Sequence, residues 1–365
     1  MFGMFKGCSS IANVCRQVAM VLKDLPGGLA LHSTNGNQPL TVELAPYVGL
    51  NCEAPIALYW GIPETVPHGL FLHSMTIGAF VCETHFIPDR WVRIANRFDV
   101  LVFPSTFCRD VFRRSGVTRP ALVVPHGVEP EYRPTGIELP AKPFIFYNAL
   151  GRAFFERKGT DVLVRAFKRA FPDEPDIELR LRVGDPEAVL SVLKEAGLTE
   201  GIPTIRVEPT QDLPTTDFAS IYSEVHCTVH PTRGEGFGLI PLQSLACGTP
   251  VIAPIHSGLM DTLRPDWISP LNAVPPANPC APGRDGYYCI EEAQLIAKLQ
   301  EMVVAYSRRK ADALALSAHI REQWTWPKAL APLTALVSAM LDGDCVEDIV
   351  PTLDVIPVSP GDPAS

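Results

Sequence analysis

The sequence lacks the features that mark several large classes of protein. It contains no run of 18 consecutive apolar residues, so no segment is predicted to span a membrane. Its ten cysteines form no Cys-x-x-Cys pair and no spacing typical of a zinc site, which favours buried thiols in a reducing compartment. Basic residues are outnumbered by acidic ones, 31 to 40, so a protein that mainly grips nucleic acid is disfavoured. We therefore expect a cytoplasmic protein without bulk nucleic-acid binding.

What the sequence does contain is a regular alternation of short apolar runs and amphipathic helices. Its 365 residues are 47% hydrophobic, which is enough for two domains with their own cores. The runs 56–60, 77–81 and 100–103 are continuous rather than alternating, as parallel strands covered on both faces should be. The same rhythm resumes at 144 and continues to about 253. This pattern predicts an α/β protein with two doubly wound, Rossmann-like domains.

The alternation of apolar runs and helices also predicts the domain boundaries. We expect a first domain over residues 1–130, a linker over 131–142 and a second domain over 143–310. The end of the chain, 343–365, is rich in proline with glycine, serine and aspartate, so disorder is predicted there. Ligands of open parallel sheets bind at the carboxyl ends of the strands, so the two domains should face a central cleft.

Two loops of the second domain carry residues suited to phosphate. The loop 234–238 has three glycines in five positions, which let the backbone approach a ligand and leave the next helix N-terminus open to an anion. The other loop has Arg152, Arg157 and Lys158 before a helix, and these cations can neutralise a diphosphate. A plain strand–turn–helix and a solvated basic loop are the alternative interpretations.

Taken in chain order, these and other motifs resemble the retaining GT-B glycosyltransferases, family 4 in particular. The segment from Glu235 to Val251 is similar to that family's E-x7-E segment, and the likeness covers roughly residues 80–340. The resemblance implies the GT-B fold, with C-terminal helices over 311–342 crossing back toward the first domain. The other matching motifs are Pro125–Val128, Gly151-Arg152, Lys158-Gly159, Pro104–Phe107 and Trp324–Trp326.

The resemblance also implies roles for individual residues. Arg152 and Lys158 would hold the leaving diphosphate of a nucleotide-sugar such as UDP-glucose, and Glu235 would bond to sugar hydroxyls. Where the family has a second glutamate this chain has Gln243, whose amide can still hydrogen-bond a ribose hydroxyl. That departure leaves an altered or non-catalytic donor site as an alternative. The remaining expected donor contacts are Gly151, Gly236, Phe237, Gly238, Leu239 and, from its place before the first helix, Gly7.

The acceptor side is less defined. Glu83 and His85 follow the strand 77–81, so both are expected to face the cleft, one of them as an acceptor-side catalytic group. The acceptor itself stays open between a glycan, a small molecule, a protein and a modified DNA base.

No convincing Asp-x-Asp metal loop is present, so we expect a metal-independent, retaining transfer in which Arg152 and Lys158 replace the cation, with no cofactor. Two alternatives within this fold are a phosphate-dependent or epimerase-type relative and a non-catalytic sugar- or nucleotide-binding protein. A Rossmann dehydrogenase is disfavoured, because Gly3 and Gly7 are wrongly spaced for a G-x-G-x-x-G turn.

Overall fold

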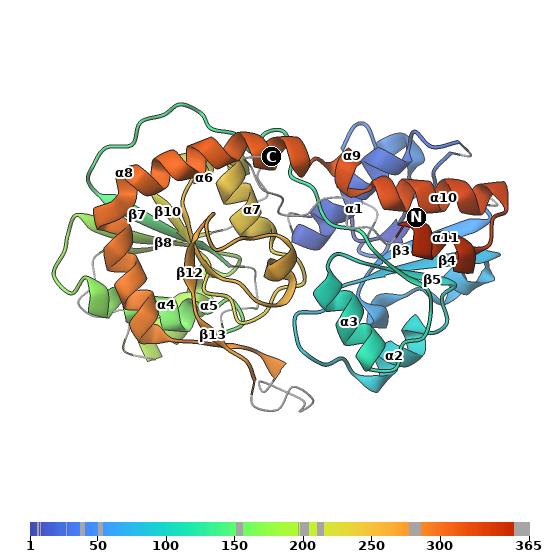
Figure 1. Ribbon diagram of the computed structural model, residues 1–365, viewed down its shortest axis with the longest axis horizontal. Helices are drawn as coiled ribbons and strands as arrows, with labels where there is room; N and C mark the ends of the chain where they lie inside the picture. Colours follow the sequence, from blue (N-terminus) through green and yellow to red (C-terminus); the bar gives the residue numbers. More distant parts are fainter. Residues whose placement is uncertain are drawn as a thin grey trace. The chain divides into compact units, whose positions relative to one another are not determined.

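The computed structural model describes residues 1–5, 7, 9–26, 28–36, 41–49, 54–150, 156–195, 197, 204–209, 215–276 and 286–353. These residues divide into two compact units (Figure 1). Unit 1 consists of residues 1–127 and 324–353, and unit 2 of residues 128–323. Each unit is built on one six-stranded sheet in which every strand pair is parallel. The predicted α/β class with two Rossmann-like domains is confirmed.

The sheet of unit 1 has the strand order β2-β1-β3-β4-β5-β6. Its central strands are buried along almost their whole length, which explains the continuous apolar runs in the sequence. Serine side chains begin two of its helices: Ser9 Oγ accepts a hydrogen bond from Ala12 N, and Ser105 Oγ accepts one from Cys108 N, both at 3.2 Å. The strands are β1 (Phe2–Gly3), β2 (His32–Ser33), β3 (Ile56–Gly61), β4 (Met75–Phe80), β5 (Val100–Phe103) and β6 (Ala121–Val123). The helices between them are α1 (Ser10–Leu22), α2 (Asp89–Ala95) and α3 (Thr106–Arg114). Short 3₁₀ turns lie at Ala45–Tyr47, Pro63–Thr65 and His68–Leu72.

Strand β1 lies between β2 and β3 although the sequence gives no sign of it. It is only two residues long, too short for any apolar periodicity to appear. A Cβ atom on Gly3 would lie 2.9 Å from Cys15 Sγ, so the bare glycine lets α1 pack directly on the strand.

The sheet of unit 2 has the strand order β12-β11-β10-β7-β8-β9. One face of β7 and β8 packs into an apolar core that includes Phe146, Leu179 and Phe167 of the helix α4. The strands are β7 (Phe144–Ala149), β8 (Ile177–Val183), β9 (Ile205–Pro209), β10 (Cys227–Val229), β11 (Val251–Pro254) and β12 (Ser269–Leu271), and β13 (Ala273–Val274) and β14 (Cys289–Ile290) form a separate pair. The helices are α4 (Thr160–Ala170), α5 (Pro186–Glu195), α6 (Thr215–Ser223), α7 (Leu239–Ala246) and α8 (Glu292–Gln323). A 3₁₀ turn lies at Ser257–Asp261.

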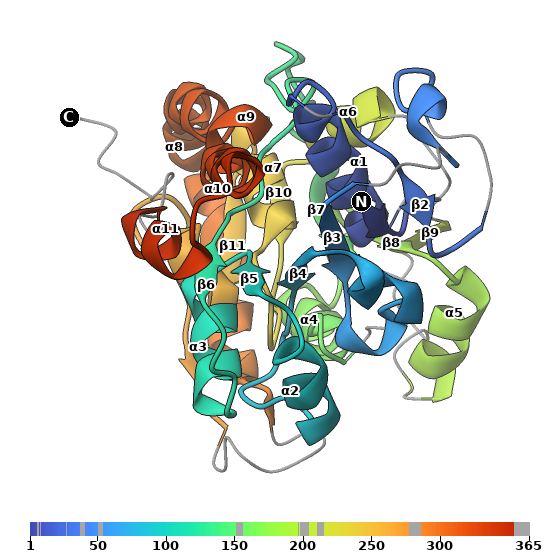
Figure 2. The same ribbon diagram turned by 90° about the vertical axis from the view of Figure 1, so that its right-hand side faces the viewer.

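The chain leaves unit 2 at the end of the 32-residue helix α8, which packs on α4 and α7. Thr325 then begins α9 (Trp326–Ala329), because its Oγ1 accepts a hydrogen bond from Lys328 N at 3.4 Å. Helix α9 and the following α10 (Ala331–Asp342) and α11 (Val346–Leu353) pack on α1, β3 and β6 of unit 1 (Figure 2).

Two segments differ from the sequence-based expectation. Residues 346–353, expected to be disordered, form α11, because its apolar side chains fall on one face and Val350 is buried. The expected linker 131–142 forms no helix or strand, but Tyr132 within it is buried with its ring 5.9 Å from that of Tyr222. Among the described residues, no helix has the length and apolar character needed to cross a membrane.

Candidate functional site

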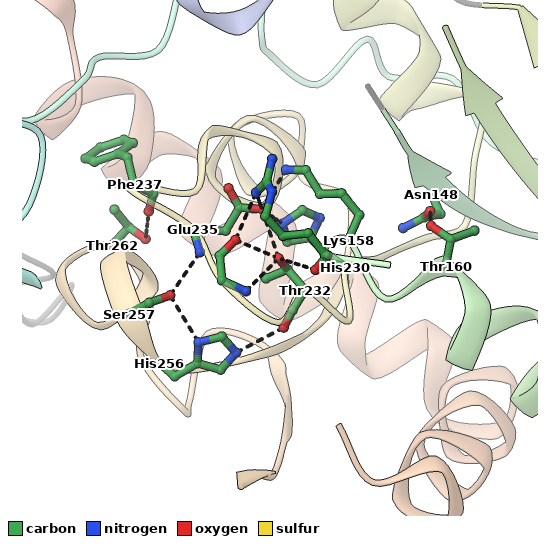
Figure 3. A network of polar contacts seen from close by, with 12 residues as sticks. Asn148, Lys158, Thr160, His230, Thr232, Glu235, Phe237, His256, Ser257 and Thr262 are labelled. Carbon is green, nitrogen blue, oxygen red and sulfur yellow. Dashed lines mark hydrogen bonds and ion pairs between the residues drawn. The ribbon is translucent and has the colours of Figure 1, made fainter. Parts of the chain in front are cut away.

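Two residues predicted from the sequence meet at one edge of the sheet of unit 2. Lys158 precedes α4, which follows β7, and Glu235 lies in the glycine loop that follows β10. Strands β7 and β10 are parallel neighbours, so the loops at their carboxyl ends are adjacent. Lys158 Nζ donates a hydrogen bond to Glu235 Oε1 at 2.5 Å (Figure 3). A cation and a carboxylate from distant parts of the chain thus form one ion pair.

The same carboxylate oxygen has further donors. His230 Nε2 lies 3.0 Å from Glu235 Oε1, Thr232 Oγ1 lies 3.1 Å from it, and Arg157 Nη1 lies 3.6 Å from it. Within the described part of the chain, the other oxygen, Oε2, has no hydrogen-bond partner. The carboxylate is therefore anchored through one oxygen and can accept a hydrogen bond from a ligand through the other. We call Arg157, Lys158, His230, Thr232 and Glu235 the carboxylate cluster.

The carboxylate cluster is buried, and this determines its charge state. Glu235, Lys158 and Arg157 are 8%, 9% and 9% exposed. Burial by itself would raise the pKa of Glu235, but the charge of Lys158, the hydrogen bond from His230 and the charge of Arg157 hold that pKa well below its usual range. Burial lowers the pKa of His230 despite its bond to Glu235. Glu235 is thus an anion and His230 a neutral imidazole that donates through Nε2.

Backbone contacts tie the two loops together. Arg233 N donates to Arg157 O at 2.7 Å, and Arg157 Nη1 donates to Gly234 O at 2.9 Å. The left-handed Gly159, with a φ of 68°, packs so closely on Pro231 O that a side chain there would collide with this carbonyl. Lys158 is consequently held next to the glycine loop by the backbone on both sides.

A third segment, after β11, fixes the backbone of Glu235. Ser257 Oγ accepts a hydrogen bond from Glu235 N at 3.1 Å and lies 3.0 Å from His256 Nδ1. His256 Nε2 lies 3.0 Å from Thr232 O, so the segment that leads into the glycine loop is held as well. Ser257 adopts a φ of 49°, a left-handed conformation rare for serine, and Gly258 leaves no room for a side chain beside Gly236 O.

The glycine loop ends at an open helix N-terminus. Gly238, in a left-handed conformation with a φ of 104°, is the N-cap of α7, and no side chain caps that helix. Pro241 has no N–H group, so the donors of the first turn are the amides of Leu239 and Ile240. These amides and the helix dipole favour an anion at this position.

Gln243 lies on α7 and is 7% exposed. Tyr222 Oη donates a hydrogen bond to Gln243 Oε1 at 3.4 Å, which leaves the Nε2 amide without a partner among the described residues. A cavity of about 540 Å³, lined by Gly184, Asp185, Pro186 and Glu187, opens after β8 at the same edge of this parallel sheet. The carboxyl edge therefore offers an anion site, a carboxylate, an amide and space for a ligand.

The other predicted site residues are not part of this cluster. Gly151 and Arg152 lie outside the described residues. Gly7, Glu83 and His85 belong to unit 1. The carbonyl of Gly7 accepts a hydrogen bond from Arg16 Nη1 at 2.9 Å, and His85 O accepts one from Arg114 Nη2 at 3.2 Å. Burial and the charge of Arg114 lower the pKa of His85.

The sequence-based site missed four residues that hold Glu235. His230 and Thr232 come directly after β10, and the rule that ligands bind beyond the carboxyl ends of parallel strands could have found them. His256 and Ser257 follow β11 and act through contacts with Thr232 and the glycine loop, for which the sequence gives no signal. In the part of the chain that the structure describes, no group of three or more histidines, cysteines or acids is placed to hold a metal ion.

Known proteins resemble this chain in sequence and in fold. The model of a family described as "Family 4 Glycosyltransferase in conflict systems" matches residues 107–333. D-inositol 3-phosphate glycosyltransferase from Stackebrandtia nassauensis is 30% identical over 229 residues, which cover 55% of this chain and 49% of that protein. The chain spans between a quarter and a half of the length of the curated relatives it matches.

Solved structures match over nearly the whole chain. Sucrose-phosphate synthase from Thermosynechococcus elongatus has a TM-score of 0.69 at 17% identity and covers 92% of this chain and 95% of its own. HepE from Anabaena, solved with UDP-glucose, has a TM-score of 0.67 at 13% identity over 93% of this chain and 98% of its own. At these identities the likeness concerns the fold, and the predicted GT-B fold is confirmed.

Proposed function

The chain belongs to the family 4 glycosyltransferases in conflict systems, and from that premise we propose that it transfers a sugar from a nucleoside-diphosphate donor to a hydroxyl acceptor. The observation that carries the proposal is the contact of Lys158 with Glu235 beside the uncapped N-terminus of α7. A cation and open amides suit a diphosphate, and a carboxylate with one unpartnered oxygen suits the hydroxyls of a sugar.

The proposed chemistry follows from where charge develops. The anomeric C–O bond to the diphosphate breaks while a bond to the acceptor oxygen forms, and the acceptor proton passes to the departing phosphate. Negative charge grows on that phosphate, so Lys158 and the amides of Leu239 and Ile240 stabilise the transition state more than the ground state. Glu235 holds the sugar through Oε2, and the contacts of Oε1 with Lys158, His230 and Thr232 keep it in place. Arg152, six positions before Lys158 in the sequence, is proposed to share the diphosphate.

The finer features of the donor reaction are also proposals. Retention of configuration rests on the resemblance of the segment 235–251 to the retaining enzymes. A UDP-glucose-like donor is supported by the fold shared with HepE, whose structure contains UDP-glucose.

Metal-independent transfer is supported by the fixed cations Arg157 and Lys158 of the carboxylate cluster. A cytoplasmic location is supported by the buried thiols of Cys15, Cys82, Cys108, Cys227 and Cys247, none of which forms a disulfide among the described residues.

Residues of unit 1 are proposed for the acceptor side. Glu83 and His85 follow β4 at the carboxyl edge of their own sheet, whereas Gly7, which follows β1 at that edge, is proposed as a donor contact. The acceptor is a hydroxyl compound from the classes named above: a glycan, a small molecule, a protein or a modified nucleobase.

A non-catalytic nucleotide-binding protein is the second candidate, and Gln243 is the observation that favours it. Its Oε1 is engaged by Tyr222, so the side chain presents an amide donor where a glutamate would present acceptors. Such a protein would bind the donor without turnover.

One experiment separates these candidates. The full chain is incubated with UDP-glucose, GDP-mannose, ADP-glucose and dTDP-glucose, and nucleoside diphosphate release is measured with and without acceptor panels and with EDTA. We expect release from one donor that acceptor accelerates and EDTA leaves unchanged. Thermal stabilisation without release would establish the second candidate, since a ligand at 100 times its Kd adds about 2.7 kcal/mol of stability. Neither stabilisation nor release with any donor would refute both.

A further inference from the structure

Unit 1 contains a segment whose charge is opposite to that of the whole chain. Residues 88–120 hold seven arginines against three aspartates, with no lysine and no glutamate, whereas the chain as a whole has a net charge of −9. The arginines are Arg90, Arg93, Arg97, Arg109, Arg113, Arg114 and Arg119. This segment therefore carries a local excess of positive charge in an acidic protein.

The fold gathers most of these arginines around one junction. Helices α2 and α3 lie side by side (Figures 1 and 2). Asn96, directly after α2, donates from Nδ2 to Gly116 O at 3.1 Å and accepts from Thr118 N through Oδ1 at 2.9 Å. Arg119 Nε donates to Asn96 O at 2.8 Å. The last turns of both helices and the chain after α3 thus meet here, and they carry the residues that we call the arginine surface: Arg93, Arg97, Arg113, Arg114 and Arg119.

Two of the three aspartates of this segment are engaged elsewhere, and outside the segment Glu347 of α11 interacts electrostatically with Arg119. Asp99 Oδ2 accepts hydrogen bonds from Thr76 N at 2.7 Å and Thr76 Oγ1 at 2.8 Å, so that carboxylate is engaged by the sheet. Asp110 pairs with Arg109 at 3.0 Å. Arg93 and Arg113 are exposed and have no ion-pair or hydrogen-bond partner among the described residues. Favourable interaction with the helix dipoles accounts for charges in the last turns, but Arg97 and Arg119 lie beyond them.

We propose that the arginine surface binds the phosphate backbone of a nucleic acid. The planar guanidinium fork fits a phosphate in a bidentate manner, and several arginines on adjacent helix ends can contact successive phosphates. The proposal concerns a local surface of a protein whose net charge disfavours tight non-specific binding, so the affinity will depend strongly on salt.

A membrane surface fits the same residues less well. Peripheral helices that bind anionic lipids insert large apolar side chains, and no exposed large hydrophobic residue occurs between residues 85 and 120. The nearest candidate is Leu72, which is 89% exposed and follows Phe71, the ring on which the Arg97 guanidinium lies at 3.8 Å. One apolar side chain beside five arginines matches a phosphate backbone better than a bilayer.

The test measures binding of the full chain to fluorescein-labelled duplex and single-stranded DNA by anisotropy, across salt concentrations of about 50 to 200 mM. We expect binding at low salt that weakens steeply, each contacting arginine adding about 0.9 to the slope of log Kobs against log salt for the duplex. The variant R93E/R113E should bind at least about tenfold more weakly and with a smaller slope, whereas R93K/R113K should retain binding. The matched control R308E/R321E makes the same charge change on α8 and should bind like the wild type.

Three outcomes would overturn the proposal. The first is no binding to either DNA at the lowest salt. The second is equal weakening by R93E/R113E and R308E/R321E, which would indicate a net-charge effect. The third is binding to vesicles of phosphatidylglycerol and phosphatidylcholine but not to DNA, weakened by L72A, which would assign the surface to a membrane. None of these measurements requires sugar transfer, so the result is independent of the proposed function.

Discussion

The two units have the same parallel-sheet plan but bury very different side chains. Among the described residues of unit 1, the buried polar side chains are Thr76, Ser105 and His126, and none of these side chains is charged under neutral conditions. Unit 2 buries five charged residues: Glu129, Arg157, Lys158, Glu178 and Glu235. The core of unit 1 is aromatic, with the ring of Phe80 packed against those of Phe98 and Phe112.

The comparison indicates that unit 2 keeps buried charges, which lower its stability, because they serve a function. Moving a charge out of water costs several kcal/mol, and an ion pair with good geometry does little more than offset that cost. Buried charges at the carboxyl edge of a parallel sheet are therefore better explained by a ligand than by stability. The predictions below test this contrast, beginning with the largest expected effect.

Removing one charge of the carboxylate cluster should affect unit 2 most. Lys158→Met leaves Glu235 buried without its closest cation, and we expect a loss of about 3–5 kcal/mol in the free energy of unfolding. Donor turnover should fall by about 10²–10³-fold, because a cation at the leaving phosphate is lost. Denaturant unfolding and nucleoside diphosphate release measure the two effects.

The double variant K158M/E235L separates stability from function. Replacing both charges by apolar groups of similar size should restore most of the stability without restoring turnover. Glu178→Gln is the matched control, because Glu178 is a buried carboxylate of the same unit that pairs with Arg180 and Arg206 away from the cluster. Full turnover by K158M/E235L would show that the cluster is structural.

Unit 1 should be sensitive to packing rather than to charge. Gly127 lies against the backbone of Trp326, so that a methyl group there would collide with the main chain. We expect Gly127→Ala to destabilise the protein by about 1–3 kcal/mol, measured by thermal or urea unfolding. Gly69→Ala, also in unit 1 but with nothing within 4 Å of the added carbon, should change stability by about 0.5 kcal/mol or less. Equal effects would contradict the packing explanation.

The buried histidine of unit 1 should make the stability depend on pH. Burial lowers the pKa of His126 from 6.5 to about 3, while its ring stacks on Trp326 at 5.8 Å. The unfolded chain therefore binds a proton that the folded chain excludes, and stability is lost as pH falls below about 6.5, by about 1.4 kcal/mol per pH unit. His126→Leu should remove this component from urea unfolding measured at several pH values. An unchanged slope in the variant would refute the assignment.

The smallest effect is expected at Gln243. Gln243→Glu supplies a carboxylate that Tyr222 can still hydrogen-bond, so donor affinity should be preserved or improved by up to about tenfold, or about 1.4 kcal/mol. Calorimetric titration with the donor that the wild type uses measures the change. A severe loss of affinity would mean that position 243 does not contact the ribose.

The sequence predicted those features that depend on neighbouring residues. The strands β3, β4 and β5 appear as continuous apolar runs because both their faces are buried, and Lys158 and Glu235 stand in recognisable loops. The two-residue strand β1 is too short to appear as an apolar run in the sequence. The role of Ser257 depends on where distant loops meet, because Ser257 reaches Glu235 across 22 positions of the chain. Lys158 and Glu235, 77 positions apart, were predicted individually, but not as an ion pair.

The most direct test of the account is a crystal structure of the full chain with a bound nucleoside diphosphate, first with UDP. We expect a phosphate oxygen within about 3 Å of Lys158 Nζ and of the amides at the start of α7, with Glu235 alongside. A diphosphate bound away from the carboxylate cluster, with Lys158 still paired only to Glu235, would contradict it.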